Sequence, residues 1–330
     1  MAVPIPIPIS QQYAIGIDIG GTNTKFGLVN HRGDISYHGA ILTHKHERIE
    51  EFIDDLYEAI IPAIEQSGGI DVIRGIGIGA PNGNIYKGTI EYAPNLKWKG
   101  IIPLADLIGK KFGVSAKLTN DANAAAVGEM TYGAAKGMKD FIMITLGTGV
   151  GSGIVANGEL IYGHDGFAGE LGHTITIPGG RLHPGTGEHG SLEAYASATG
   201  VARTALEFLD RQPYEESLMR NYAREEIDAR VVYECAMEGD KLALEVYDFT
   251  GKILGLALAN FVMFSSPEAI IFFGGMAKAG DLLMVPVRET MEKHLLPIFR
   301  NKVKLIFSEL KEADAAILGA SALVWEMKQA

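Results

Sequence analysis

The chain has 330 residues, 47% of them hydrophobic and 21% charged, so it is long enough for two domains with separate cores. Its formal net charge of −11 argues against a nucleic-acid partner, because binding a phosphate backbone requires a basic surface. The single cysteine, Cys235, excludes an intrachain disulfide and a cysteine-based zinc site.

The N-terminal residues 1–9 alternate apolar residues with prolines, which exclude a helix, so we expect an extended arm to which we assign no role. This stretch lacks the basic segment and helical apolar core of a signal peptide. The longest apolar run, 253–264, is too short to span a bilayer and contains Asn260. The sequence therefore predicts a soluble, cytoplasmic protein that binds no membrane.

A predicted strand at 13–17 leads directly into a polar turn at 18–25, which we call the first phosphate hairpin. Its paired glycines, Gly20 and Gly21, allow backbone N–H groups to approach an anion. Side chains that suit the phosphates and a hydrated Mg²⁺ flank the turn, namely Thr22, Thr24, Lys25 and the carboxylate of Asp18. Taken alone, the same residues are equally typical of an ordinary β-turn.

The next elements alternate between helix and strand, which is typical of an α/β protein. Apolar residues at helical spacing predict a helix over 48–66, and a buried strand over 71–79 follows. A helix over 105–112 and a strand over 116–119 come next. The glycines of 75–83 imitate a dinucleotide fingerprint, but Pro81 and a turn stand where the helix should start, which argues against NAD.

Two amides and an acid open an alanine-rich helix at Asn120, Asp121 and Asn123. Asn and Asp are preferred N-caps, so capping alone explains one of them. Three polar residues exceed what one cap needs. Asp121 is therefore also a candidate to accept a proton from an alcohol that attacks a phosphoryl group.

A second strand, Gly/Thr turn and strand at 140–155 repeat the pattern of the first phosphate hairpin. We call its turn, 147–151, the second phosphate hairpin and expect two similar halves that place both turns on one cleft. After a small-residue helix at 242–264, a strand at 269–273 ends in Gly274 and Gly275, a natural seat for a nucleoside. The last predicted helix covers 313–328.

Two glycine-rich segments, 166–173 and 190–193, carry Glu170, His173 and Glu193. Carboxylates and imidazoles hydrogen-bond the vicinal hydroxyls of a sugar, and the glycines leave room for it. A structural role or a metal remains an alternative for His173. The spacing of Glu170 and His173 also occurs in metal sites, although the glycines disfavour the rigid helix that such sites need.

These motifs together resemble the ROK family of sugar kinases, specifically its glucokinase branch, over about residues 14–324. The resemblance is carried, in the family's order, by the segments 18–25, 93–98, 120–125, 146–151, 169–173 and 273–275. It implies an actin-like ATPase (ribonuclease H-like) α/β fold with a cleft between two domains. The smaller domain would cover 1–122 plus 312–330, and the larger domain would cover 123–311.

The resemblance also implies roles for individual residues. Asp121 would be the catalytic base. The sugar would be held by Asn120, Asp121, Glu170, His173 and Glu193, with Gly83 and Asn95 as further contacts. The ATP phosphates would be lined by Gly20, Gly21, Thr22, Lys25, Gly147, Thr148 and Gly149, with Gly274 and Gly275 near the nucleoside. Asp18 would order Mg²⁺ through water.

The sequence departs from the family at a structural zinc site. The family carries three cysteines between its Gly-His element and its Leu-Glu pair, whereas the corresponding segment, 184–193, has none. His173, His183 and His189 could offer three nitrogens, but we expect the loop to fold without zinc. The family also contains repressors with an N-terminal helix-turn-helix. Only a dozen residues precede Tyr13, and with the acidic charge this disfavours that interpretation.

The resulting hypothesis is ATP-dependent phosphorylation of a hexose, with glucose favoured, by a homodimer. Fructose, mannose, N-acetylglucosamine and N-acetylmannosamine remain alternative substrates, and polyphosphate remains an alternative donor. Two rival classes also stay open. One is a non-catalytic sugar sensor of the same family, and the other is an actin-like ATPase that acts on a protein partner.

Overall fold

A computed structural model of the protein describes residues 7–211 and 216–325. The chain forms two compact units. The first unit comprises Met1–Met138, Leu160–Gly169 and Glu309–Ala330, and the second comprises Lys139–Glu159 and Glu170–Ser308. Most of the predicted N-terminal arm and the end of the last predicted helix lie outside the described residues.

The first unit contains a five-stranded sheet in the order β3-β2-β1-β4-β8. β1 pairs antiparallel with β2 and β2 with β3, whereas β4 runs parallel to β1 and to β8. The strands are β1 (Tyr13–Ile19), β2 (Asn23–Asn30), β3 (Ile35–Leu42), β4 (Ile73–Ala80) and β8 (Ala116–Asn120). A small sheet contains β5 (Gly83–Asn84), β6 (Thr89–Glu91) and β7 (Ile101–Ile102).

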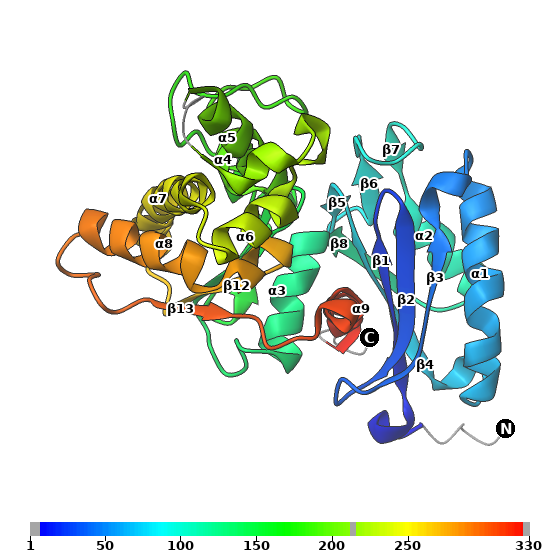
Figure 1. Cartoon of the computed structure of the whole chain (residues 1–330). Helices are drawn as coiled ribbons and strands as arrows, with labels where there is room; N and C mark the ends of the chain where they lie inside the picture. The colour runs from blue at the N-terminus through cyan, green and yellow to red at the C-terminus, as the bar shows by residue number, and fades with distance from the viewer. Residues whose placement is uncertain (1–6, 212–215, 326–330) are drawn as a thin grey trace, which may run out of the picture. The chain divides into compact units, whose positions relative to one another are not determined.

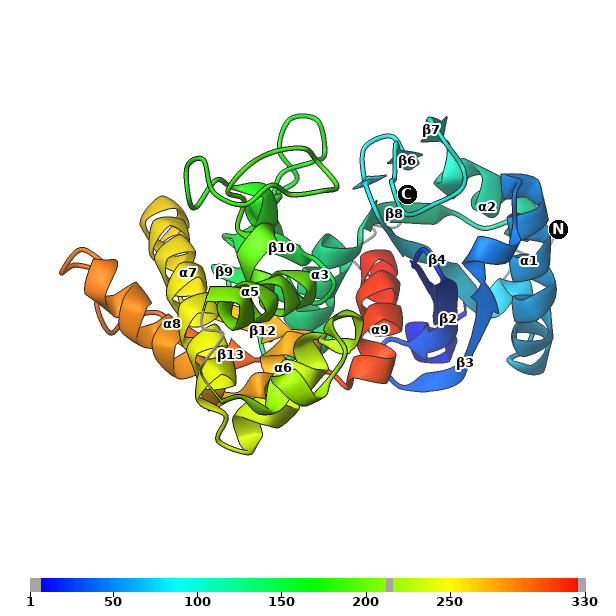
Figure 2. The same ribbon diagram turned by 45° about the horizontal axis from the view of Figure 1, so that its top comes forward.

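Helices cover both faces of the first sheet (Figures 1 and 2). α1 and α2 pack on one face, and α9 and α3 pack on the other. Their bounds are α1 (Ile49–Gln66), α2 (Leu104–Phe112), α3 (Asp121–Tyr132) and α9 (Glu312–Trp325). As its helical spacing predicts, α1 buries Phe52, Leu56 and Ile60 in the core of this unit.

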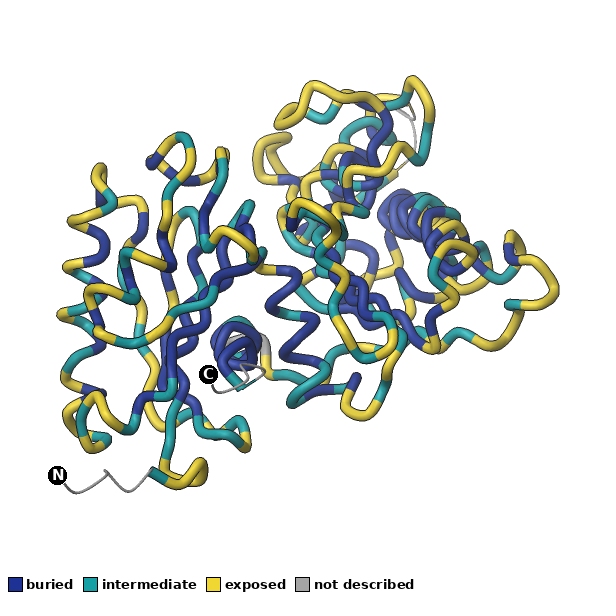
Figure 3. The backbone as a smooth tube through the Cα atoms, turned by 180° about the vertical axis from the view of Figure 1, so that it is seen from behind, coloured by how far each residue is buried: buried dark blue, intermediate teal, exposed yellow. Residues whose placement is uncertain are grey.

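A row of glycines lets α9 lie close to the sheet. Gly27, Gly16 and Gly77 are paired neighbours on β2, β1 and β4. A Cβ at Gly77 would overlap the carbonyl oxygen of Ala320 in α9, and one at Gly16 would overlap that of Ile317. The helix is accordingly buried along most of its length, as Figure 3 shows beside the C-terminus.

The second unit repeats this sheet, with the order β11-β10-β9-β12-β13. An antiparallel hairpin, β9 with β10, is again followed by two parallel neighbours, β12 and β13. The strands are β9 (Phe141–Leu146), β10 (Val150–Ala156), β11 (Glu159–Leu160), β12 (Ala269–Phe273) and β13 (Lys304–Phe307). The predicted internal repeat and the predicted α/β class are confirmed.

The core of the second unit lies between its sheet and its helices, among which α7 packs along α8. The helices are α4 (Glu193–Ala196), α5 (Ala198–Arg211), α6 (Ala229–Met237), α7 (Lys241–Ser265) and α8 (Asp281–His294). Short 3-10 turns connect the elements of both units, at Ile9–Gln11, Thr43–Lys45, Ile70–Val72, Leu171–His173, Leu218–Asn221, Arg224–Glu226 and Gly275–Ala279.

α3 lies with α9 in the first unit, where Gly128 and Gly319 allow a close contact between the two helices. The bounds expected from the sequence for a smaller domain, 1–122 plus 312–330, and a larger domain, 123–311, stay a prediction. None of the helices in the described ranges is long and apolar enough to cross a lipid bilayer.

Candidate active site

The first phosphate hairpin is the tight connection between β1 and β2. Gly20 N–H donates to the carbonyl of Asn23 at 3.0 Å, which closes the turn. The side chains of Thr22 and Lys25 are exposed, so both are accessible to an anion. Thr24 is different, because it is buried and its hydroxyl lies 2.7 Å from that of Thr43. The expectation that Thr24 donates to a phosphate is therefore wrong.

Asn95 lies against the first phosphate hairpin. A Cβ at Gly21 would stand 2.8 Å from the backbone oxygen of Asn95, so glycine permits this approach. The Asn95 side chain is exposed. Gly83, by contrast, is buried, and a Cβ there would overlap the carbonyl of Thr119 in β8. Gly83 thus packs against β8 at Leu118 and Thr119, and its contact with a sugar stays a prediction.

Asp121 stands where β8 ends and α3 begins. Asn120 is the N-cap, since its side-chain oxygen accepts from Ala122 N–H at 2.9 Å, so the capping interpretation holds for Asn120. Asp121 Oδ1 accepts from the same N–H at 2.8 Å. The backbone N–H of Asp121 itself also bonds to this carboxylate, and the residue is exposed. Because Asp121 is exposed, its carboxylate is accessible to a substrate hydroxyl.

Gly79 is buried between Ala124, Asp18 and Asp121, and a Cβ there would stand 3.3 Å from the Cβ of Ala124. A Cβ at Gly79 would stand 3.7 Å from Asp18 Oδ1 and 3.7 Å from Asp121 Cα. Burial, and then the nearby charge of Asp121, raise the pKa of Asp18 to about 6, while Lys25 opposes that rise. The dense protein around Asp121 likewise raises the pKa of its carboxyl above the usual range, although its side-chain surface remains open to solvent.

This pair of carboxylates fits the Mg²⁺ that an ATP-dependent enzyme requires. Two neighbouring carboxylates suit a cation that keeps most of its water ligands. A divalent charge would also favour the ionised forms of Asp18 and Asp121, opposing the effect of their burial.

The second phosphate hairpin is held by Glu193 and by the start of α5. Gly147 N–H donates to the carbonyl of Gly149 at 3.0 Å, and Ala198 N–H donates to that of Gly147 at 2.8 Å. Val150 N–H donates to Glu193 Oε2 at 2.6 Å. A Cβ at Gly149 would overlap this carboxylate, so glycine leaves room for Glu193 in its observed position. Thr148 is exposed at the tip.

Glu193, which the sequence assigns to the sugar, already has a protein partner on each oxygen. Oε2 accepts from Val150, and Oε1 lies 2.7 Å from His183 Nε2. Glu170 and His173 lie together, with His173 Nε2 3.7 Å from Glu170 Oε2, and their side chains are 51% and 40% exposed. A ligand could reach both, and their binding of sugar hydroxyls stays a prediction, as it does for Glu193.

The histidines of this region do not form a zinc site. The Nδ1 atom of His183 accepts from Thr186 N–H at 3.1 Å, and its Nε2 faces Glu193, so both nitrogens are engaged. The Nδ1 atom of His189 donates to the carbonyl of Gly180. Within residues 7–211 and 216–325, no three His, Cys, Asp or Glu side chains are placed to hold a metal ion. The donor set thus does not match tetrahedral zinc.

Gly274 and Gly275 follow β12 beside the second phosphate hairpin. Gly274 has φ of 104°, and a Cβ there would overlap the carbonyl of Leu146, the last residue of β9. Nothing lies within 4 Å of a Cβ built on Gly275, so its surroundings are open. The nucleoside seat at Gly274 and Gly275 stays a prediction.

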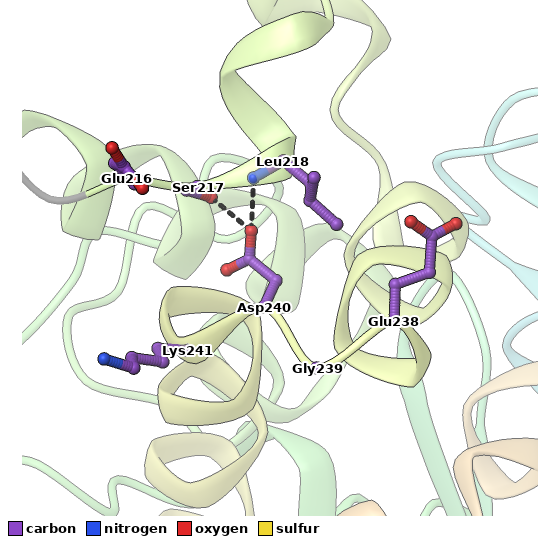
Figure 4. A pocket seen from close by; sticks show the side chains of 7 residues that line it. All are labelled: Glu216, Ser217, Leu218, Glu238, Gly239, Asp240 and Lys241. Carbon is purple, nitrogen blue, oxygen red and sulfur yellow. Dashed lines mark hydrogen bonds between the residues drawn. The ribbon is translucent and has the colours of Figure 1, made fainter.

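A separate cavity of about 600 Å³ lies in the second unit, where 216–218 face 238–241 (Figure 4). Asp240 accepts hydrogen bonds from the Ser217 hydroxyl and from Leu218 N–H, and its other oxygen caps α7 at Ala243 N–H. These bonds join two turns and a helix start. The cavity contains none of the predicted site residues.

Two residues near the site escaped the sequence interpretation. Gly79 was visible only as part of a glycine run that imitates a nucleotide motif, and His183 only as a possible metal ligand. Their observed neighbours, Asp121 for Gly79 and Glu193 for His183, are distant in sequence. No local signal in the sequence identifies either contact.

Several named proteins resemble this chain over nearly its whole length. Glucokinase of Halalkalibacterium halodurans is 36% identical, with 97% of this chain and 96% of that protein covered. Glucokinase of Thermotoga maritima is also 36% identical, with 94% and 97% covered. A putative xylose repressor of a Caldicellulosiruptor species is 30% identical over 94% of this chain and 77% of that protein.

A solved structure gives the same relationship. The ROK family glucokinase of Streptomyces griseus, in complex with glucose and AMPPNP, superposes with a TM-score of 0.78 at 32% identity, covering 94% of this chain and 98% of that one. The ROK family pattern itself matches residues 14–327. The repeated sheet with its two turns and the similarity over nearly all of the sequence lead to one conclusion: the chain belongs to the ROK family.

Proposed function

We propose that this chain is a sugar kinase that transfers the γ-phosphoryl group of ATP to a hexose, with the C6 hydroxyl of glucose as the acceptor. The observation that carries the proposal is Asp121, an exposed residue at the start of α3 whose carboxylate lies near that of Asp18. Relatives named glucokinase, and one solved with glucose and AMPPNP, support the choice of both substrates.

Phosphoryl transfer requires little covalent chemistry from the protein. Asp121 accepts the proton of the attacking hydroxyl as the new oxygen–phosphorus bond forms and ADP leaves with its bridging oxygen. The raised pKa of Asp121 makes it a stronger base than an ordinary aspartate. Mg²⁺, when bound through water near Asp18, would neutralise phosphate charge.

The remaining residues position the two substrates. Asn95 and Asn120 in the first unit, and Glu170 and His173 in the second, are assigned to the sugar hydroxyls. The two hairpins offer backbone N–H groups to the ATP phosphates, with Thr22, Lys25 and Thr148 exposed beside them. Such positioning supplies most of the catalytic effect expected in phosphoryl transfer.

A coupled assay of ADP release across a hexose panel tests the proposal. We expect release that depends on added sugar and is fastest with glucose, with slower release for N-acetylhexosamines, mannose and fructose. ATP hydrolysis that is independent of sugar would contradict a sugar kinase. Activity with polyphosphate in place of ATP would change the donor and leave the acceptor chemistry intact.

A further inference from the structure

His183 joins three features of the second unit through one imidazole. Its Nδ1 accepts from Thr186 N–H at 3.1 Å, so in the neutral ring the proton is on Nε2. Nε2–H then donates to Glu193 Oε1 at 2.7 Å. The ring also packs edge-on against that of His173, with centroids 5.6 Å apart. The side chains of His183 and Glu193 are only 15% and 18% exposed.

Glu193 links His183 to the second phosphate hairpin. The carboxylate that His183 orients accepts from Val150 N–H at 2.6 Å through its other oxygen. Val150 is the first residue of β10, and the missing side chain at Gly149 makes room for the carboxylate. A hydrogen-bonded path therefore runs from the loop at 183–186 through Glu193 to the hairpin backbone.

We propose that His183 is a positioning residue that sets the geometry of the second phosphate hairpin through Glu193. The proposal depends on the function proposed above only for its kinetic readout. Without the donor at Nε2, the Glu193 carboxylate can rotate away from Val150 N–H, and the hairpin backbone loses the anchor on that side. Because the hairpin is assigned to the ATP phosphates, the loss should act on nucleotide binding.

Two amide substitutions distinguish the roles of the two ring nitrogens of His183. In His183→Gln, the amide NH₂ replaces Nε2–H and still donates to Glu193. In His183→Asn, the shorter amide can accept from Thr186 but cannot reach Glu193. His189→Asn serves as the control, because its NH₂ replaces the Nδ1–H that donates to Gly180 and this histidine does not contact Glu193.

The measurements are the KM for ATP, kcat, and hydrogen exchange of a peptide covering 147–156. We expect His183→Asn to raise the KM for ATP about tenfold or more, with a smaller change in kcat, and to speed exchange at the hairpin. His183→Gln should stay within about threefold of the parent in KM, as should the control. Melting temperatures of all variants check that the fold is kept.

Other outcomes would overturn the positioning role. If His183→Asn keeps the KM for ATP and the hydrogen exchange of the parent, His183 does not set the geometry of the hairpin. Equal losses in the Gln and Asn variants would assign the effect to packing, and so would failure of His183→Asn to fold. If the parent shows no sugar kinase activity, the proposed function fails, and exchange at 147–156 still decides whether His183 holds the hairpin.

Discussion

Asp121 is the residue on which the proposed chemistry depends most. Replacing it with Asn keeps the size and the bond from Ala122 N–H but removes the base. We expect turnover to fall about a thousandfold or more, the scale of a lost general base, while the dissociation constant for glucose changes less than about threefold. A coupled assay and calorimetry measure the two quantities. Turnover within about tenfold of the parent would exclude Asp121 as the base.

The ionised carboxylate of Asp18 destabilises the fold, although it is the form proposed to contact Mg²⁺. Its titration gives a second prediction. Its pKa is 3.8 as a free side chain and about 6 in the fold, so the folded protein binds the proton more tightly. Stability from this group is therefore greatest at low pH and is lost as the pH rises from about 4 to about 6. At neutral pH the ionised carboxylate costs up to about 3 kcal/mol.

Asp18→Asn should therefore stabilise the protein without ligands while it removes the proposed Mg²⁺ contact. We expect the free energy of unfolding to rise by up to about 3 kcal/mol near pH 7.5, and by less near pH 5. Urea denaturation at the two pH values measures this difference. An unchanged or lower stability of Asp18→Asn near pH 7.5 would show that the site does not strain the Asp18 carboxylate.

Among the elements, α9 depends on the glycine row of the first sheet. Gly77→Ala would place a methyl group against the carbonyl of Ala320, and backbone on both sides leaves no room to shift. We expect a loss of about 1–3 kcal/mol in the free energy of unfolding, as for other overpacked cores. Gly275→Ala is the matched control for stability, since its Cβ would meet nothing within 4 Å. Equal stabilities in urea denaturation would contradict this account of the packing.

The two sheets also show what sequence can predict about the elements. Alternation of apolar runs with Gly/Thr turns predicted both hairpins and the internal repeat, because strand periodicity and turn chemistry are local properties. The spacing of Phe52, Leu56 and Ile60 likewise predicted α1. The sequence does not predict the glycine row, because the row spans three strands. Only the register of these strands places Gly27, Gly16 and Gly77 side by side.

Side-chain contacts between distant segments mark the limit of prediction for the candidate site. The sequence suggested Thr24 as a donor to phosphate. In the structure, the turn after β3 places the hydroxyl of Thr43 against that of Thr24. Glu193 looked like a sugar ligand alone, but tertiary packing places both of its oxygens on protein partners. Residue type and spacing identified the candidates, and only the folded chain shows how each side chain is occupied.

At the scale of the whole molecule, the central claim is that the chain moves a phosphoryl group from ATP to glucose. Phosphorus NMR of a reaction with ATP, Mg²⁺ and glucose measures this directly, because it separates a sugar phosphate from free phosphate. We predict one glucose 6-phosphate for each ADP formed, and neither product with the Asp121→Asn variant over the same time. Inorganic phosphate appearing in place of glucose 6-phosphate, at a rate independent of glucose, would contradict the claim.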